Sequence, residues 1–231
     1  MEIHGLQKLT LLDFPGHTAC TVFTAACNWR CPFCHNASLV LRPREQPVIP
    51  EEEFFAFLQK RRGLLDGVAV TGGEPTLQKD LPEFLRKIKA AGFAVKLDTN
   101  GTHPAMLREI LSQGLADYVA MDIKAGRMNY SAVTGTLRPG LDAVAESVEL
   151  LRTSGVTHEF RTTVVRELHA DEDFIDIARW LAGEERYFLQ AFKDSGDIIS
   201  GGYSACTREE MEHFLALAAE TIPNAQIRGM D

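Results

Sequence analysis

The sequence lacks the features of a membrane-bound or exported chain. No apolar run of roughly 18 residues occurs among its 231 residues. The opening MEIHGLQK lacks the charged-then-apolar order of a signal peptide. Long Gly/Ser linkers, low-complexity tracts and internal repeats are missing as well. These absences predict one cytoplasmic domain over residues 1–231, with no membrane partner.

An excess of positive charge is also lacking. The chain has 24 Lys and Arg against 32 Asp and Glu, a formal net charge of -8. Because the average field of such a protein repels a phosphate backbone, we expect no nucleic-acid partner. The hydrophobic share of 45% and the charged share of 24% are typical of a globular protein with a sizeable core.

Cysteine is scarce but concentrated. Of five cysteines, Cys27, Cys31 and Cys34 lie within eight residues, which favours a metal site in a reducing compartment over a disulfide framework. Cys20 lies in the apolar stretch ACTVF and is expected to be a small buried hydrophobe. No role is assigned to Cys206.

Short apolar runs alternate with helical runs along the whole chain. This order predicts an α/β fold with parallel strands and right-handed crossovers, a partial (β/α)6 TIM-type barrel. In such folds the functional residues gather at the carboxyl ends of the strands. The predicted strands are 18–24, 67–71, 94–98, 118–123, 159–165 and 187–192.

Charged residues indicate where several helices begin. Residues 50–53, a proline and three glutamates, predict one helix start that suits the helix dipole. Asp80 with Glu83, and Thr207 with Glu210, have capping-box spacing. The acidic run 171–173 is interpreted as a solvated first turn rather than a metal site.

The three clustered cysteines follow the first predicted strand in a loop too short to hold a further element. Thiolates at such spacing can bind three corners of an iron–sulfur cube and leave one iron open, which favours catalysis. A zinc site would need His35 as a fourth ligand. Adjacent residues such as Cys34 and His35 seldom reach one metal without strain, but from spacing alone the zinc alternative stays open.

The CxxxCxφC loop, with Phe33 as its aromatic residue, resembles the signature of the radical S-adenosylmethionine superfamily. The resemblance implies one [4Fe-4S] cluster on Cys27, Cys31 and Cys34. It also implies that S-adenosylmethionine chelates the fourth iron and is cleaved to a 5′-deoxyadenosyl radical, with the cofactor rather than the protein supplying the chemistry. No catalytic side chain is expected beyond the cluster and S-adenosylmethionine.

Motifs at later strand ends extend the resemblance. GGEP could be a plain turn, but it resembles the GGE segment that binds the methionyl ammonium. The carboxylates of Asp98 and Asp122, and Lys124, could bind the cofactor, with Lys124 on the methionyl carboxylate. Alternatively, they could be helix caps and structural ion pairs. The cofactor-binding residues so implied are Phe33, Asn36, Gly72, Gly73, Glu74, Asp98, Asn100, Asp122, Lys124, Arg161 and Gln190.

The segments DTNG, DIK and CHN resemble a narrower group, the activating enzymes of glycyl-radical proteins. That resemblance implies a possible monovalent-cation site at Asp98, Thr99 and Asp122. It also gives Arg161 a cofactor contact, for which a salt-bridged barrel arginine is the alternative.

The opening LQKLTLLDFPG and the closing YFLQAF and IRG look most like anaerobic ribonucleoside-triphosphate reductase activating proteins. A glycyl-radical partner enzyme and flavodoxin or ferredoxin as electron donor follow from this resemblance. Gln190 stands where formate-lyase activases carry histidine, so the acceptor polypeptide stays open. Two other functions stay open at this point: a radical enzyme for a small molecule, and a non-catalytic iron–sulfur or zinc module.

Overall fold

The computed structural model describes residues 1–230. These residues divide into two compact units, each made of several chain segments. The first unit holds residues 1–28, 38–120 and 142–157, and the second holds 29–37, 121–141 and 158–230. The single domain expected over the whole chain stays a prediction.

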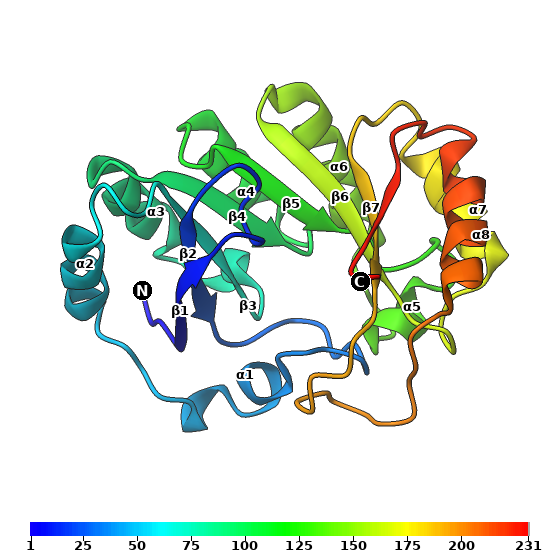
Figure 1. The fold of residues 1–231 in the computed structure, drawn as a ribbon, viewed down its shortest axis with the longest axis horizontal. Coiled ribbons are helices and arrows are strands. Elements are labelled where there is room, and N and C mark those ends of the chain that lie inside the picture. Colours follow the sequence, from blue (N-terminus) through cyan, green and yellow to red (C-terminus); the bar gives the residue numbers. More distant parts are fainter. Residues whose placement is uncertain (231) are drawn as a thin grey trace. The chain divides into compact units, whose positions relative to one another are not determined.

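The first unit contains four strands that follow one another in the sheet (Figure 1). β1 pairs antiparallel with β2, while β2, β3 and β4 are parallel, with Val22 opposite Val70. The strands are β1 (Gly5–Thr10), β2 (Ala19–Thr24), β3 (Gly67–Gly72) and β4 (Ala94–Thr99). The helices are α1 (Ala37–Leu41), α2 (Glu51–Lys60), α3 (Leu81–Ala90), α4 (Pro104–Ser112) and α6 (Leu141–Ser154), with short 3-10 turns at Pro43–Glu45 and Pro75–Leu77.

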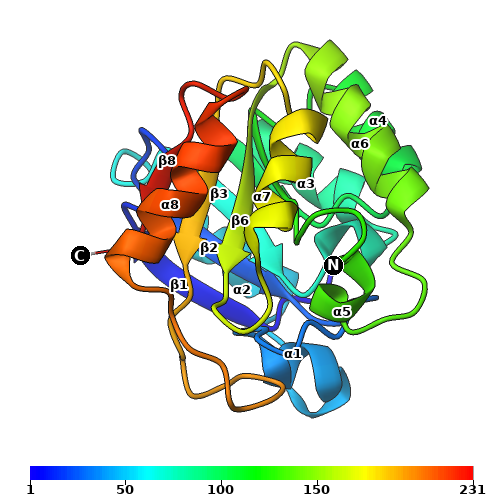
Figure 2. The same ribbon diagram turned by 90° about the vertical axis from the view of Figure 1, so that its right-hand side faces the viewer.

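β5 (Tyr118–Asp122) has residues in both units, and in the second unit β6 pairs in parallel with β7, and β7 with β8. The second unit holds β6 (Thr157–Val164), β7 (Tyr187–Ala191), β8 (Gln226–Arg228), α5 (Tyr130–Thr134), α7 (Asp171–Trp180) and α8 (Arg208–Ala219). α7 and α8 lie side by side (Figure 2), and the rings of Phe174 and Phe214 stack between them with centroids 4.3 Å apart.

All six predicted strands are present as β2 to β7, and the α/β class is confirmed. Two further strands were missed. β1 exposes three consecutive residues and carries no apolar run. β8 has only three residues. Its Arg228 donates two hydrogen bonds of 2.9 Å to the carboxylate of Glu159, which is 1% exposed. A sequence scan for apolar runs does not find strands held by pairing and charge.

The helix starts are mostly as expected. α2 begins at Glu51, and Thr207 and Glu210 form their capping box. The capping box predicted for Asp80 and Glu83 is wrong. The Asp80 side chain makes no hydrogen bond to the helix N-terminus and lies 2.9 Å from the N-terminal ammonium group of the chain instead. The solvated first turn is also wrong for Asp173, which is buried and accepts the Gly126 N–H at 2.9 Å.

Two expectations about apolar segments can be compared with the structure. Cys20 is fully buried, as predicted, and burial raises the pKa of its thiol to about 12. Among residues 1–230, no helix is both long enough and apolar enough to cross a bilayer.

Candidate functional site

The cysteine loop begins in the first unit and continues in the second. Cys27 belongs to the first unit, where its sulfur lies 3.9 Å from Oδ1 of Asn28 and 3.9 Å from Nδ2 of Asn100. Asn100 also donates to Asn28 at 2.9 Å, so a residue at the end of β4 helps to hold the first cysteine. The predicted cofactor residue Asn100 and the predicted ligand Cys27 therefore do lie together.

In the second unit, the segment after α5 anchors the middle of the cysteine loop. The indole N–H of Trp29 donates to the carbonyl oxygen of Pro139 at 3.1 Å, and Trp29 is 2% exposed. The Arg30 N–H donates to the Thr134 oxygen at 2.9 Å. A Cβ at Gly135 would lie 2.2 Å from the Arg30 oxygen, and its φ of +64° is left-handed, so glycine is required there.

The paired glycines at the end of β3 are in close contact with the backbone that leads from β2 to Cys27. A Cβ at Gly72 would lie 2.3 Å from the Thr24 oxygen, and one at Gly73 would lie 1.9 Å from the Ala26 oxygen. Both gaps are far below van der Waals contact, so only glycine fits. The Glu74 N–H donates to the Ala26 oxygen at 2.8 Å. The two motifs are thus joined through backbone contacts.

Glu74 is 1% exposed, and neutral donors surround its carboxylate. Oε1 accepts hydrogen bonds from the Thr76 N–H at 3.0 Å and from Oγ1 of Thr99 at 2.8 Å, and Oε2 accepts from the Asn100 N–H at 2.7 Å. Burial raises the pKa of the Glu74 carboxyl, and these hydrogen bonds offset part of the rise. Glu74 therefore joins the GGEP and DTNG loops, a role that the motif reading did not foresee.

Asp98 has a partner that the sequence analysis missed. Nζ of Lys96 donates to Oδ1 of Asp98, and both side chains point to the same face of β4, as residues two apart in a strand do. Lys96 is 2% exposed, although it lies in an otherwise apolar strand. A lysine between Val95 and Leu97 was the available signal, since lysine is almost never fully buried unless it is paired.

Asp122, at the end of β5, has two cationic partners. Nε of Arg161 donates to Oδ1 at 2.7 Å, and Nζ of Lys124 donates to Oδ2 at 2.8 Å. Asp122 is 26% exposed, and Lys124 and Arg161 are 15% exposed each. The structure thus forms the ion pair and the salt-bridged arginine that were the alternatives to cofactor binding; the cofactor contacts themselves stay predictions.

Opposing effects set the ionisation of this triad. Burial disfavours the charged form of Asp122, but Arg161 and Lys124 outweigh it and hold the pKa of the carboxyl well below its usual range. Burial likewise lowers the pKa of Lys124, but the Asp122 carboxylate more than reverses this and raises it. All three groups are charged, and the triad offers cationic donors to an anionic ligand.

Two residues that the sequence did not mark position the Lys124 backbone. The Lys124 N–H donates to the hydroxyl of Tyr130 at 3.2 Å, and the Lys124 oxygen lies 2.8 Å from Nε2 of His169. Both partners are buried. Their contacts depend on tertiary packing, and no motif announces them.

The remaining predicted residues lie in the second unit. The ring of Phe33 packs edge-on against Phe192 with centroids 6.4 Å apart, and the ring of His35 lies 5.4 Å from the same phenylalanine. The Asn36 N–H is a hydrogen-bond partner of the Cys34 sulfur, whose pKa burial raises. Gln190 lies on β7, opposite Arg228 of β8.

The donor set fits an iron–sulfur cluster and a zwitterionic cofactor. All five cysteines are free thiols. Gly72 and Gly73 leave room only for backbone, and the Asp122 triad supplies cations. The monovalent-cation site has less support, because Lys96 and the Lys124–Arg161 pair already occupy its two carboxylates. Among residues 1–230, no three His, Cys, Asp or Glu side chains form a preassembled metal group. Both ligand sets stay predictions.

Comparison with known proteins identifies the family in which these motifs occur. The sequence profile of the radical SAM superfamily matches residues 21–181. A Methanocaldococcus jannaschii protein, provisionally named a glycyl-radical enzyme activating enzyme, is 32% identical over 98% of this chain and 95% of its own length. The pyruvate formate-lyase-activating enzyme of Clostridium pasteurianum is 30% identical over 64% of this chain and 63% of its own length.

Other relatives carry a different activity in their names. A protein of Pyrococcus abyssi, named a probable GTP 3′,8-cyclase, is 31% identical over 72% of this chain and 53% of its own length. This chain thus spans about half the length of that relative.

Solved structures show the fold. SuiB of Streptococcus suis bound to its precursor peptide SuiA superposes with a TM-score of 0.68 at 14% identity, over 90% of this chain and 48% of SuiB. SuiB bound to S-adenosylmethionine gives a TM-score of 0.66, also at 14% identity, over 88% of this chain and 48% of SuiB. The predicted partial barrel of parallel strands is confirmed. The family profile and the full-length relative show that this chain belongs to the radical SAM superfamily, whose cofactors are a [4Fe-4S] cluster and S-adenosylmethionine.

Proposed function

We propose that this radical SAM enzyme is an activase that generates a glycyl radical on a partner enzyme, anaerobic ribonucleoside-triphosphate reductase. Flavodoxin or ferredoxin supplies the electron, and the reaction takes place in the cytoplasm. The observation that carries the proposal is the match to the M. jannaschii relative, which spans 98% of this chain and 95% of that protein.

The cluster and S-adenosylmethionine, when bound, supply after one-electron reduction a 5′-deoxyadenosyl radical that takes a hydrogen atom from a glycine Cα. In the proposal, Cys27, Cys31 and Cys34 hold the cluster. The residues in contact with them keep the loop in place before the cofactor arrives.

The carboxylates of Glu74 and Asp122 have separate positioning roles. Glu74 ties the GGEP loop to Thr99 and Asn100, so that backbone groups of both loops face a ligand in a fixed geometry. Asp122 orients Lys124 and Arg161 toward the anionic part of the cofactor. The other proposed cofactor contacts are Phe33, Asn36, Gly72, Gly73, Asp98, Asn100 and Gln190.

A second candidate keeps the radical chemistry but acts on a small molecule. The GTP 3′,8-cyclase relatives favour it. It has less support, because the P. abyssi relative is matched over only 53% of its length.

The experiment that separates the two candidates is electron paramagnetic resonance after anaerobic reconstitution with iron and sulfide. With S-adenosylmethionine, a reductant and the host's anaerobic reductase, we expect a doublet glycyl-radical signal on the reductase. The signal should be absent with Cys31→Ala. Turnover of GTP without any glycyl-radical protein would favour the second candidate.

A further inference from the structure

Lys96 is a buried cation to which the site described above gives no task. It lies within β4 between Val95 and Leu97, and its side chain is only 2% exposed. In the parallel register of the first unit it is opposite Ala69, which is itself opposite Thr21. The neighbouring row of side chains is therefore small and leaves room for the long lysine stem. Because burial of a lone ammonium group is costly, the lysine needs a specific partner.

Asp98 is that partner. Its side chain is 14% exposed, and Oδ1 accepts a hydrogen bond from Nζ of Lys96. The two residues are two apart in one strand, so the backbone of β4 brings their side chains together without any contact from elsewhere. A metal cation on the same carboxylate would lie close to the ammonium group, and two like charges repel strongly in a mostly buried place. Asp98 thus receives its positive charge from the protein itself.

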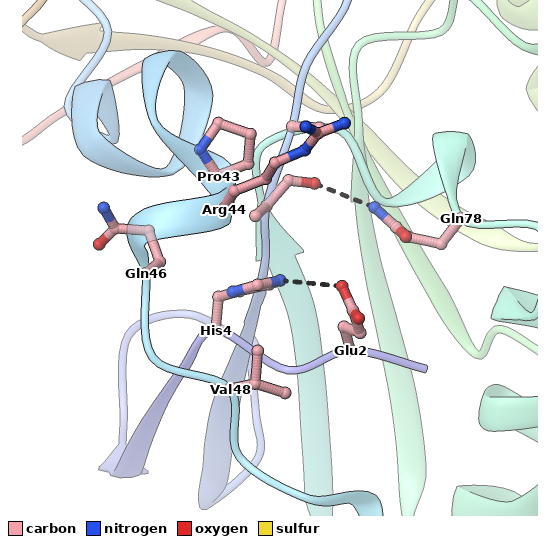
Figure 3. A pocket seen from close by; sticks show the side chains of 9 residues that line it. Glu2, His4, Pro43, Arg44, Gln46, Val48 and Gln78 are labelled. Carbon is pink, nitrogen blue, oxygen red and sulfur yellow. Dashed lines mark hydrogen bonds and ion pairs between the residues drawn. The ribbon is translucent and has the colours of Figure 1, made fainter.

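The hydroxyl of Thr99, the next residue of the implied cation site, is also engaged. It donates to Oε1 of Glu74 at 2.8 Å and accepts the Gly101 N–H at 3.2 Å. The loop that carries Glu74 is fixed in turn, because the amide N–H of Gln78 donates to the Ala25 oxygen at 2.9 Å (Figure 3). A hydroxyl has one proton and two lone pairs, so these contacts leave at most one lone pair for a cation.

Asp122, the third implied ligand of the cation, is paired within the second unit. Arg161 donates to its Oδ1 at 2.7 Å, and Lys124 donates to its Oδ2 at 2.8 Å. Each carboxylate of the implied site therefore already has a cationic side chain on it. The residues present do not fit a monovalent metal cation.

We infer that this chain carries its own cation at Asp98. The ammonium group of Lys96 takes the place of the monovalent metal ion that the resemblance to glycyl-radical activases implies. Lys96 is then a positioning residue, which holds the Asp98 carboxylate in one orientation without an ion from solution. The ion requirement does not depend on which molecule the radical attacks, so it can be tested apart from the activase proposal.

Replacement of Lys96 by methionine isolates the role of the ammonium group. The methionine side chain has one heavy atom fewer than that of lysine, so Lys96→Met keeps an apolar stem and leaves a place for an ion beside Asp98. The matched control is Lys89→Met in the same unit. It removes a pair of 2.5 Å with Asp117, in which the two side chains are 33% and 39% exposed, so water can solvate the remaining carboxylate.

Thermal unfolding of the full-length chain is measured in potassium, sodium and choline chloride at equal ionic strength. The series is run without cofactors and again with the cluster reconstituted anaerobically and S-adenosylmethionine added. We expect wild type and Lys89→Met to unfold at the same midpoint in all three salts. The midpoint of Lys96→Met should rise with potassium or sodium but not with choline, because an ion that binds only the folded state stabilises it by mass action.

Thallium NMR with thallous acetate, in which the thallous ion is a probe for potassium, measures the binding itself. Binding to Lys96→Met should be saturable and at least about tenfold tighter than to wild type. Saturable binding of the ion by wild type, or a wild-type midpoint that rises specifically with potassium or sodium, would overturn the inference. Equal destabilisation of Lys96→Met in all three salts would also overturn it, because a merely structural lysine leaves no ion site behind.

A second variant covers the case in which Lys96→Met does not fold. The double variant Lys96→Met with Asp98→Asn removes both charges together and should show no ion dependence in the same salts. Ion dependence of this double variant would place the ion elsewhere and contradict the role of Asp98. The wild-type titration decides between a resident ammonium group and a bound metal ion in either case.

Discussion

Two carboxylates near strand ends, Glu74 in the first unit and Asp122 in the second, are stabilised in opposite ways. Glu74 in the first unit is surrounded by neutral N–H and O–H donors. Asp122 in the second unit lies between two cationic side chains. Burial therefore prevails at Glu74 and raises its pKa, whereas the charges prevail at Asp122 and lower its pKa.

The difference suits two kinds of task. Neutral hydrogen bonds fix a backbone without adding charge, so Glu74 orders two loops. Ion pairs fix charged side chains that can still contact a ligand, so Asp122 holds Lys124 and Arg161 ready for an anion. Replacing one carboxylate at a time tests whether the two environments differ in this way.

The largest expected effect comes from Asp122→Ala. It leaves the charges of Lys124 and Arg161 without a carboxylate in a mostly buried place, which should lower the free energy of unfolding by about 3–5 kcal/mol. Urea unfolding followed by circular dichroism measures it. The control in the same unit is Asp171→Ala, which removes the contact with His213, where both side chains are more than half exposed; its cost should stay below about 1 kcal/mol. Equal costs for the two variants would contradict the account of Asp122.

Glu74→Gln should have a smaller effect. An amide can still accept from Thr99, but its NH₂ group faces the Asn100 N–H, and two donors then oppose each other. We expect a loss of about 1–3 kcal/mol in the free energy of unfolding, measured in the same urea series. Glu83→Gln, an exposed glutamate of the same unit, should be nearly neutral. A neutral Glu74→Gln would remove the loop-joining role.

The smallest expected effect is a pair of opposite pH dependences. The stability from Asp122 is fully present above its ordinary pKa of 3.8 and is lost as the pH falls through its lowered native value. The stability from Glu74 is fully present below 4.5 and is lost as the pH rises through its raised native value.

The difference in the free energy of unfolding between wild type and Asp122→Asn should therefore become smaller as the pH falls below 4. The difference in the free energy of unfolding between wild type and Glu74→Gln should become smaller as the pH rises above 4.5. Each slope is at most about 1.4 kcal/mol per pH unit for one group. Urea midpoints measured across this range test the signs, and parallel slopes for the two variants would show that the environments do not differ as described.

The strands that sequence could predict are those whose own residues are apolar. β2 to β7 are short buried runs and were found, whereas β1 and β8 are held by strand pairing and by the Arg228–Glu159 contact. The Asp80 box failed because the N-terminal ammonium group competes for its carboxylate, and such a distant partner leaves no local signal.

The sequence motifs also identified residues of the site, but they did not identify the residues that contact them. Spacing marked Cys27, Glu74 and Asp122, because cofactor chemistry constrains residue types locally. Lys96, Tyr130 and His169 act through contacts across the fold, which a single sequence does not encode in any short pattern.

Quantifying 5′-deoxyadenosine tests the central claim most directly. The full-length chain is reconstituted anaerobically with iron and sulfide, reduced with dithionite and mixed with S-adenosylmethionine. We predict 5′-deoxyadenosine and methionine in equal amounts from wild type and neither product from Cys31→Ala. One zinc per chain and no 5′-deoxyadenosine from the wild type would contradict the account.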